Sequence, residues 1–206
     1  MKFYKFMRFI CYLPIYIGLP TKVIGNNLPK EGKFILTCNH QSLNDVLVVC
    51  IKVKRVIRFI AKKELFKSKL MAWFMKRMGV IAVDRDKPDL SSFKNVVKVL
   101  KEGGVVGVFP EGTRNKKQDG KLLPFKSGVA MFALKTKTPI VPMLLVRKPK
   151  LFRRNQLVIG EPFELTEYYD KPIDAEVLDV ATEIIYQKTL ALKEKTTIKC
   201  KKLKKA

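Results

Sequence analysis

Short apolar segments with strand character alternate with segments of helical character along most of the chain, and this alternation restricts the possible folds more than any other feature. The strand-like segments are rich in Val, Ile and Phe, which favour a pleated, buried backbone. We predict strands at residues 33–38, 55–61, 79–83, 105–109, 139–146 and 157–160. We predict helices at residues 43–52, 65–78, 88–101, 126–136 and 175–194.

This order of elements predicts an α/β fold, a single domain with a mainly parallel central sheet flanked by helices. The chain has 206 residues, of which 47% are hydrophobic, and this is enough for one well-filled core. We assign residues 29–195 to this domain and residues 196–206, which end in KKLKKA, to a basic C-terminal tail. The tail is either a solvated, frayed end or an electrostatic tether to a membrane.

Residues 1–28 form a separate N-terminal segment in this interpretation, with helical and interfacial character. Residues 3–19 read FYKFMRFICYLPIYIGL, and three cations, Lys2, Lys5 and Arg8, lie at the start of this stretch. A helix that spans a bilayer needs about 20 apolar residues, and the uncharged run here is shorter. Basic residues before an apolar run also occur in secretory signals, but no A-x-A-like cleavage site follows. We expect a membrane-docking helix that lies in the interface, and the alternative is an amphipathic helix packed on the domain.

The charge balance is extreme, because 42 lysines and arginines stand against 18 aspartates and glutamates and give a net charge of +24. Self-repulsion of this size is tolerated more easily when the partner is anionic. Three kinds of partner fit: nucleic acid, an anionic membrane surface, and a substrate or carrier protein that bears phosphate or acidic groups. Charge alone does not choose among them.

The chain has one histidine, His40, and four cysteines, at positions 11, 38, 50 and 200. The cysteine spacing fits neither a zinc site nor a disulfide framework. We therefore expect reduced thiols and no bound metal. Cys38 lies close to His40 in the sequence, but its place in an apolar strand favours a buried thiol over a nucleophile.

The segment NHQSLND, residues 39–45, follows a predicted strand and contains His40 and Asp45. These two residues are five positions apart and would not share a face of one helix. A loop that leads into the first turn of the next helix would bring them together, and an acidic group is favourable at that helix end. Asp45 can then orient the imidazole ring of His40, fix its tautomer and raise its basicity.

A second polar segment, FPEGTRN at residues 109–115, follows another predicted strand. Gly112 allows the backbone to approach a ligand closely, and the guanidinium of Arg114 suits a phosphate. Glu111 is unusual in a phosphate site, so we expect it to accept a hydrogen bond from a substrate hydroxyl or to orient Arg114. The alternative is a polar turn with an internal Glu–Arg pair.

Three further segments carry weaker signals. The segment GVIAVDR, residues 79–85, is a predicted strand that ends in an acid and a base, and on its own it fits a surface ion pair. The segment LPFKSG, residues 123–128, opens a predicted helix, where Lys126 would help to bind an anion. The apolar segment TPIVP, residues 138–142, fits either the wall of an acyl groove or plain core.

Taken together, these segments resemble the glycerolipid acyltransferase family that includes the 1-acylglycerol-3-phosphate acyltransferases. The resemblance extends from about residue 29 to residue 162. NHQSLND matches the family's HX4D motif, and GVIAVDR matches a glycine, a hydrophobic stretch and an arginine. FPEGTR matches the third family block letter for letter, whereas IVPMLLV matches the fourth block, an apolar strand with proline, only loosely.

The resemblance implies a role for each matching residue. His40 is expected to be the general base, and Asp45 is expected to be its orienting partner. The other matching residues are expected to form the acceptor site, with the arginines on its phosphate: Arg85, Glu111, Gly112, Thr113, Arg114 and Lys126.

The implied reaction moves a fatty acyl chain from an acyl thioester to the free hydroxyl of 1-acylglycerol 3-phosphate and gives phosphatidic acid. The donor would be acyl-CoA or an acylated acyl carrier protein, acting as a co-substrate, and no cofactor is expected. The expected partners are this lysophospholipid, the donor and an anionic membrane surface. The expected location is the cytoplasmic face of the cell membrane.

Other functions stay open at this stage. The acceptor could be another lysolipid, glycerol 3-phosphate or a lipid A precursor, although the arginines favour a phosphorylated one. A nucleic-acid-binding module or an inactive membrane-binding scaffold would also fit the charge. We expect no nucleic-acid partner, because the sequence lacks an RRM-type aromatic signature and a recognition-helix motif. The His40–Asp45 pair argues against an inactive scaffold.

Overall fold

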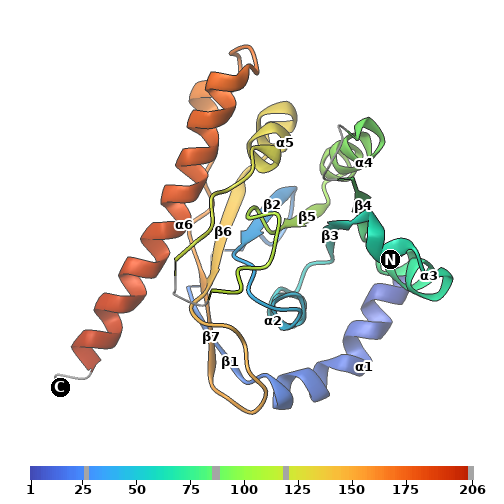
Figure 1. The fold of residues 1–206 in the computed structure, drawn as a ribbon, viewed down its shortest axis with the longest axis vertical. Coiled ribbons are helices and arrows are strands. Elements are labelled where there is room, and N and C mark those ends of the chain that lie inside the picture. Colours follow the sequence, from blue (N-terminus) through green and yellow to red (C-terminus); the bar gives the residue numbers. More distant parts are fainter. Residues whose placement is uncertain (26–27, 85–88, 118–120, 204–206) are drawn as a thin grey trace.

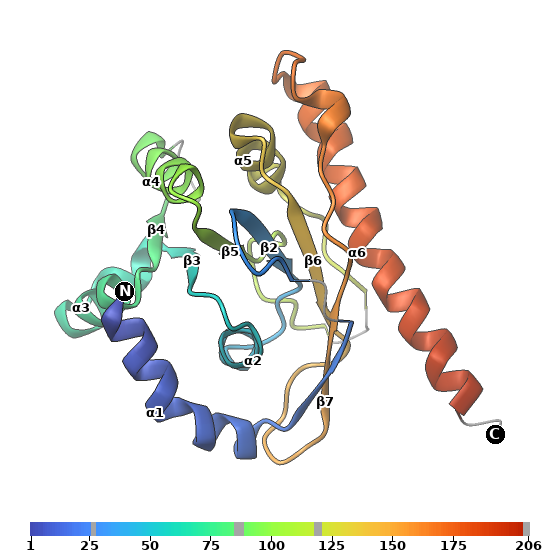
Figure 2. The same cartoon turned by 180° about the vertical axis from the view of Figure 1, so that it is seen from behind.

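The computed structural model describes residues 1–203 except 26–27, 85–88 and 118–120, and it describes side chains up to residue 194. Within these residues the chain forms a seven-stranded sheet with helices on both faces (Figures 1 and 2). The strand order is β1-β7-β6-β2-β5-β3-β4. Neighbouring strands are parallel except β6 and β7, which are antiparallel. The predicted α/β domain with a mainly parallel sheet is therefore confirmed.

Strands and helices alternate along the chain much as the sequence predicts. The strands are β1 (Thr21–Ile24), β2 (Phe34–Cys38), β3 (Ile57–Lys62), β4 (Ile81–Val83), β5 (Val105–Val108), β6 (Ile140–Leu145) and β7 (Asn155–Ile159). The α-helices are α1 (Lys2–Gly18), α2 (Asn44–Lys52), α3 (Lys69–Met78), α4 (Leu90–Lys101), α5 (Gly128–Thr136) and α6 (Ala175–Leu203). Two short 3-10 helices are η1 (Lys63–Phe66) and η2 (Thr166–Tyr168).

The sheet separates two apolar layers, and β2 contributes to both. Phe34 and Leu36 pack with Val48 and other residues of α2 on one face. Ile35 packs with residues of α4, α5 and α6 on the other face. Successive side chains of a strand point to opposite faces, so a strand covered on both sides has to avoid charge at every position. All five residues of β2 are accordingly buried.

The edge strand β1 was not predicted from the sequence. We predicted helical character for residues 1–28, and α1 confirms this for the first part of that segment. Thr21 to Ile24, however, pair in parallel with residues 155–158 of β7. The strand has only four residues and is mostly half-buried, so its pairing depends on β7 and not on a pattern of its own.

Two predicted helices have a different N-terminal part from the one expected. The helix predicted at residues 65–78 is divided into η1 and α3, because the backbone at Ser68 is extended. The helix α4 begins at Leu90, after Asp89, whose side chain caps it by accepting a hydrogen bond from the backbone N–H of Ser92 at 3.0 Å. Pro88, the predicted first residue, lies outside the described residues.

The last two helices also differ from their predicted limits. The helix α5 begins at Gly128, so Lys126 precedes it instead of opening it. The helix α6 continues to Leu203, so most of the predicted tail at residues 196–206 has a helical backbone.

Candidate functional site

Two of the segments singled out in the sequence leave the sheet at the same edge. The strands β2 and β5 are parallel neighbours, with Thr37 opposite Val108. His40 follows the end of β2, and Glu111 follows the end of β5. Because both loops begin at the carboxyl ends of adjacent parallel strands, they lie where ligands bind in sheets of this kind. Both segments directly follow a strand, as the sequence predicts.

The imidazole ring of His40 is hydrogen-bonded to the carboxylate of Asp45. Nδ1 of His40 lies 2.8 Å from Oδ2 of Asp45, which belongs to the first turn of α2 as predicted. An ionised carboxylate only accepts hydrogen bonds, so Nδ1 carries the proton and Nε2 of the neutral ring is left as an acceptor. The side chain of His40 is 16% exposed, whereas that of Asp45 is fully buried. The pair can therefore present a basic nitrogen whose tautomer is fixed from the interior.

Asp45 is itself held by the turn before α2. Its Oδ2 accepts hydrogen bonds from the backbone N–H groups of Gln41 and Ser42, the latter at 2.7 Å. Its Oδ1 accepts from the hydroxyl of Ser42 at 2.9 Å. A buried carboxylate is tolerated when it is hydrogen-bonded in this way, and the orientation of Asp45 behind the ring is fixed.

The main chain of His40 is held by the loop that follows β5. Its backbone N–H donates to Oε1 of Glu111 at 2.9 Å, and its carbonyl oxygen accepts from the backbone N–H of Asn115 at 2.7 Å. Oε2 of Glu111 accepts from the backbone N–H of Leu123 at 3.2 Å. Glu111 is only 3% exposed, and this burial raises the pKa of its carboxyl group. Both oxygens of Glu111 are thus engaged by the main chain, which differs from the two roles expected from the sequence.

Sequence reasoning missed two residues that shape the site, Phe109 and Asn39. The ring of Phe109 stacks on that of His40, with centroids 4.2 Å apart, and on that of Phe59 in β3 at 5.8 Å. Asn39 is buried, and its amide exchanges two hydrogen bonds with the backbone of Leu145 at the end of β6. Each is the first residue of a segment singled out in the sequence, NHQSLND or FPEGTRN, but the sequence analysis assigned it no role.

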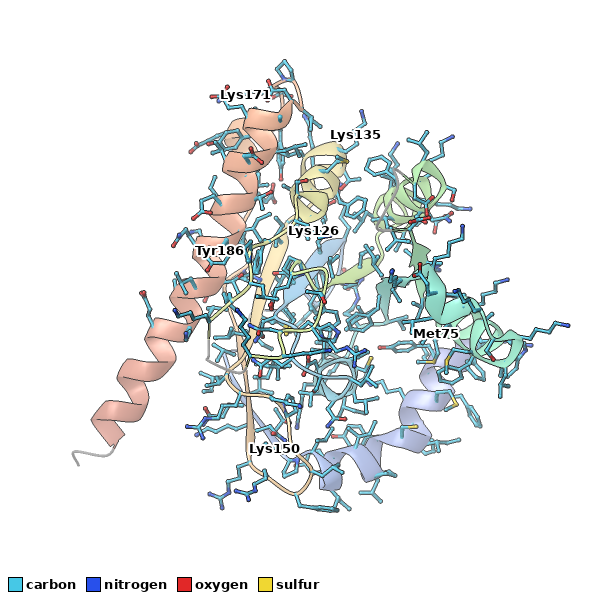
Figure 3. All side chains as sticks on the ribbon, in the orientation of Figure 1. Met75, Lys126, Lys135, Lys150, Lys171 and Tyr186 are labelled. Carbon is cyan, nitrogen blue, oxygen red and sulfur yellow. The ribbon has the colours of Figure 1, made fainter. Side chains whose placement is uncertain are left out.

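The other predicted acceptor residues lie on the outer side of the loop. Thr113, Arg114 and Lys126 are exposed, and Gly112 has a left-handed backbone with a φ of 67°. The aliphatic stem of Lys126 crosses Gly112 so closely that a Cβ there would come within 2.9 Å of its carbons. The backbone N–H of Lys126 also donates to the carbonyl oxygen of Pro110 at 2.9 Å. Lys126, which precedes α5 (Figure 3), therefore belongs to this loop.

The two predicted arginines have different outcomes. Arg85 lies outside the described residues, although the strand β4 that leads to it is described. Within the described part of the chain, Arg114 forms no hydrogen bond or ion pair, so the internal Glu–Arg pair considered as an alternative is not formed. The guanidinium of Arg114 is available to an anionic ligand.

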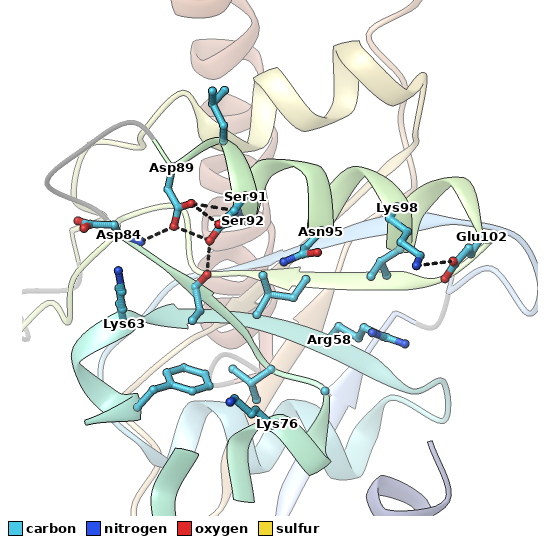
Figure 4. A pocket seen from close by; sticks show the side chains of 17 residues that line it. Arg58, Lys63, Lys76, Asp84, Asp89, Ser91, Ser92, Asn95, Lys98 and Glu102 are labelled. Carbon is cyan, nitrogen blue, oxygen red and sulfur yellow. Dashed lines mark hydrogen bonds and ion pairs between the residues drawn. The ribbon is translucent and has the colours of Figure 1, made fainter. Parts of the chain in front are cut away.

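A groove of about 820 Å³ lies along the edge strand β4, between α3 and α4 (Figure 4). Residues 79–82 and Asp84 form part of its lining, together with the cations Arg58, Lys63 and Lys76. Asp89 at one end is engaged by Ser92 and by the rest of the helix cap. Neither His40 nor Asp45 lines this groove, so it is separate from the histidine–aspartate pair.

The thiol of Cys38 lies in the core at the end of β2. Burial raises its pKa well above the ordinary value, and a thiol that resists ionisation is a poor nucleophile. The prediction of a buried strand thiol is therefore confirmed. Within the described ranges, no group of three or more His, Cys, Asp or Glu side chains is placed to hold a metal ion.

Comparisons with known proteins agree on one family. The acyltransferase family model matches residues 20–146, which include both loops of the site. A 1-acyl-sn-glycerol-3-phosphate acyltransferase from Bacillus subtilis is 34% identical over 175 residues, covering 82% of this chain and 85% of the relative. One from Cocos nucifera is 34% identical over 163 residues, covering 75% of this chain and 52% of the relative.

The fold is also similar to a solved structure. The crystal structure of the 1-acyl-sn-glycerophosphate (LPA) acyltransferase from Thermotoga maritima matches with a TM-score of 0.66 and 27% sequence identity. The match covers 95% of this chain and 78% of that chain.

Proposed function

This chain belongs to the acyltransferase family, and from that premise we propose that it moves a fatty acyl chain from an acyl thioester to the free hydroxyl of 1-acylglycerol 3-phosphate. The product is phosphatidic acid. The observation that carries the proposal is the contact between Nδ1 of His40 and Asp45, which leaves Nε2 as a base next to a loop with exposed cations.

The mechanism is a direct transfer. Nε2 of His40 removes the proton of the acceptor hydroxyl as that oxygen attacks the thioester carbonyl. The ester bond forms, the carbon–sulfur bond breaks, and the proton passes from the imidazolium to the departing thiolate. Asp45 stabilises the positive ring in between. Base catalysis of this kind contributes about 10²–10⁴-fold, and the fixed ring and main chain of His40 add a contribution from orientation.

The acceptor's phosphate binds, in this proposal, to Arg114 and Lys126. Both side chains are exposed and come from the loop that also holds the main chain of His40. A guanidinium can engage two phosphate oxygens at once, whereas an ammonium acts as a point charge. Thr113 adds a hydroxyl donor, and Arg85 takes the same role as Arg114 by the family resemblance.

The donor is acyl-CoA or an acylated carrier protein. CoA carries phosphate groups, and the acyl carrier protein is acidic. The net charge of +24 therefore favours encounter with either one.

The helix α1 is proposed to dock on the membrane that supplies the acceptor. Its apolar side chains recur at helical spacing and face solvent, with Phe9 81% exposed, Leu13 61% and Ile17 58%. Among the helices of the described residues, none has both the length and the apolar character to cross a bilayer. We propose an interfacial position for α1 at the cytoplasmic face of the cell membrane.

An assay of the purified protein tests the function. Lysophosphatidic acid is offered with a mixture of acyl-CoAs in one reaction and with acylated carrier protein in another, and the products are identified by mass. Phosphatidic acid with either donor supports the proposal and identifies the donor. Parallel reactions contain glycerol 3-phosphate or a monoacylglycerol as the acceptor. Acylation of one of these, with none of lysophosphatidic acid, would overturn the proposal.

A further inference from the structure

Two large apolar side chains are exposed at the tip of the connection between β6 and β7. We call residues 146–154 the β6–β7 loop. Within it, Leu151 is 60% exposed and Phe152 is 78% exposed. Single exposed apolar residues are common on protein surfaces, but neighbouring large ones that adjoin further exposed apolar residues mark an interaction site.

Hydrogen bonds hold the β6–β7 loop in this shape. The side chain of Asn155 accepts from the backbone N–H of Lys150 at 3.0 Å and donates to the carbonyl oxygen of Lys150 at 3.2 Å. Phe152 has a φ of 55°, a backbone conformation that bulky residues rarely adopt. A strained residue persists only where its surroundings fix it, so the outward position of this ring is built into the fold.

The β6–β7 loop rests against the end of α1. The backbone N–H of Phe152 donates to the carbonyl oxygen of Gly18 at 2.7 Å, and a Cβ on Gly18 would lie 3.6 Å from Cδ2 of Leu151. Figures 1 and 2 both place the loop beside the C-terminal end of α1, and Figure 3 shows Lys150 at this end of the molecule. The exposed apolar stripe of α1 and the tip of the loop therefore adjoin.

The charges of the β6–β7 loop are all of one sign. Residues 147–154 read RKPKLFRR, with five lysines or arginines and no acidic residue. Cations that flank exposed apolar side chains suit an anionic lipid surface, because the cations reach the headgroup phosphates while the apolar groups enter below them. A nucleic acid would match the cations and could stack a base on Phe152, but it would leave Leu151 and the exposed apolar stripe of α1 without an apolar partner.

The β6–β7 loop also contacts the catalytic turn. The side-chain amide of Asn44 donates to the carbonyl oxygen of Pro149 at 3.2 Å, and Asn44 directly precedes Asp45. The same turn exposes Leu43, which is 66% accessible. A lipid surface in contact with the loop therefore lies close to the turn that holds His40 and Asp45.

We propose that the β6–β7 loop is a second membrane anchor, which inserts Leu151 and Phe152 into an anionic lipid surface while its cations bind headgroup phosphates. With α1, which it adjoins, it gives two points of attachment near the catalytic turn, and two points restrict the orientation of the domain on the membrane. The inference rests on the proposed function only in that the acceptor comes from a membrane.

Fluorescence of the full chain on vesicles tests this anchor. A Phe152→Trp substitution in a Trp73→Phe background places the single tryptophan at the loop tip. Vesicles of phosphatidylcholine with phosphatidylglycerol should shift its emission to the blue, and lipids brominated on their acyl chains should quench it. Unchanged emission with such vesicles would overturn the anchor.

Vesicle binding of a loop variant gives the second measurement. In the double variant Leu151→Ser with Phe152→Asn, asparagine tolerates the left-handed backbone. We expect its partitioning onto these vesicles to fall at least about tenfold, from the lost burial of two large apolar side chains. Leu90→Ser, a leucine that is 72% exposed on α4, should bind like the wild type. Equal binding of the double variant and the Leu90→Ser control would contradict the proposal.

Turnover of a short-chain, monomeric lysophosphatidic acid without vesicles separates the anchor from the function. The double loop variant should acylate it at the wild-type rate, because no membrane takes part. Turnover without any emission shift on vesicles would reject the anchor and leave the function standing. Insertion of the tryptophan without turnover by the wild type would support the anchor and reject the function.

Discussion

The carboxylate of Glu111 lies 2.9 Å from the backbone nitrogen of His40, so the loop after β5 directly positions the histidine that follows β2. The second oxygen of the same carboxylate lies 3.2 Å from the backbone nitrogen of Leu123. One buried side chain thus joins three segments of the site. The junction needs two acceptor oxygens, which a carboxylate has and an amide lacks.

Glu111→Gln is therefore expected to lower both stability and turnover. The amide offers one oxygen, so the backbone N–H of either His40 or Leu123 faces an NH2 group, and an unsatisfied buried donor costs about 1–3 kcal/mol. Chemical denaturation measures the free energy of unfolding, and kcat with saturating lysophosphatidic acid reports the position of His40. The exposed Glu167→Gln is the control, and a Glu111→Gln variant as stable and active as this control would contradict the positioning role.

Asp45→Asn tests the fixed tautomer of His40. The buried carboxylate accepts from Nδ1 and from neighbouring backbone N–H groups. An amide that turns its NH2 toward Nδ1 forces the ring proton to Nε2 and removes the base, so kcat should fall by about 10²–10⁴-fold. Steady-state kinetics measure the loss in kcat, and the His40→Ala variant gives the rate that remains without the catalytic base. Circular dichroism verifies the fold of each variant. Wild-type turnover in a folded Asp45→Asn variant would reject this assignment.

Arg114→Ala is expected to weaken binding of the phosphorylated acceptor. Loss of a charge-assisted hydrogen bond costs about 1.5–3 kcal/mol, so KM for lysophosphatidic acid should rise about 10–100-fold while KM for the donor stays unchanged. Arg114→Lys should recover part of the lost affinity for the acceptor, since lysine keeps the positive charge but lacks the planar guanidinium that engages two phosphate oxygens. The exposed Lys135→Ala on α5 is the control. An equal rise in KM for a monoacylglycerol, which lacks the phosphate, would argue against the phosphate contact.

The central strands were predictable because burial on both faces leaves a direct mark on the sequence. Every residue of β2 and β6 is buried, which requires an uncharged, mainly apolar run. The edge strand β1 was not predictable, because its four residues pair only with β7, which is more than a hundred positions away. The break before α3 was missed because the apolar spacing of residues 65–78 continues across Ser68, where the backbone is extended.

The predicted part of the site follows from local spacing, and the missed part follows from contacts between distant residues. His40 and Asp45 are five positions apart, and the turn into α2 alone brings them together. Glu111 is 71 positions from His40, and Asn39 is 106 positions from Leu145. Their hydrogen bonds go to backbone groups, which every residue type carries, so no pattern of side chains indicates them.

Asp89→Asn should remove part of the acid sensitivity of the fold. The pKa of Asp89 is far below its ordinary value because its carboxylate accepts hydrogen bonds from the side chain and backbone of Ser92, and also from Ser91. The ionised form is favoured in the folded state. Its contribution to stability is therefore complete above the pKa of the unfolded state and is lost as the pH falls toward the pKa of the folded state.

Asparagine also caps a helix but does not titrate. Between about pH 5 and about pH 2, the Tm of the wild type should therefore fall more than that of Asp89→Asn, while the exposed Asp179→Asn should follow the wild type. Parallel curves of Tm against pH for the wild type and Asp89→Asn would show that this cap does not contribute to acid unfolding.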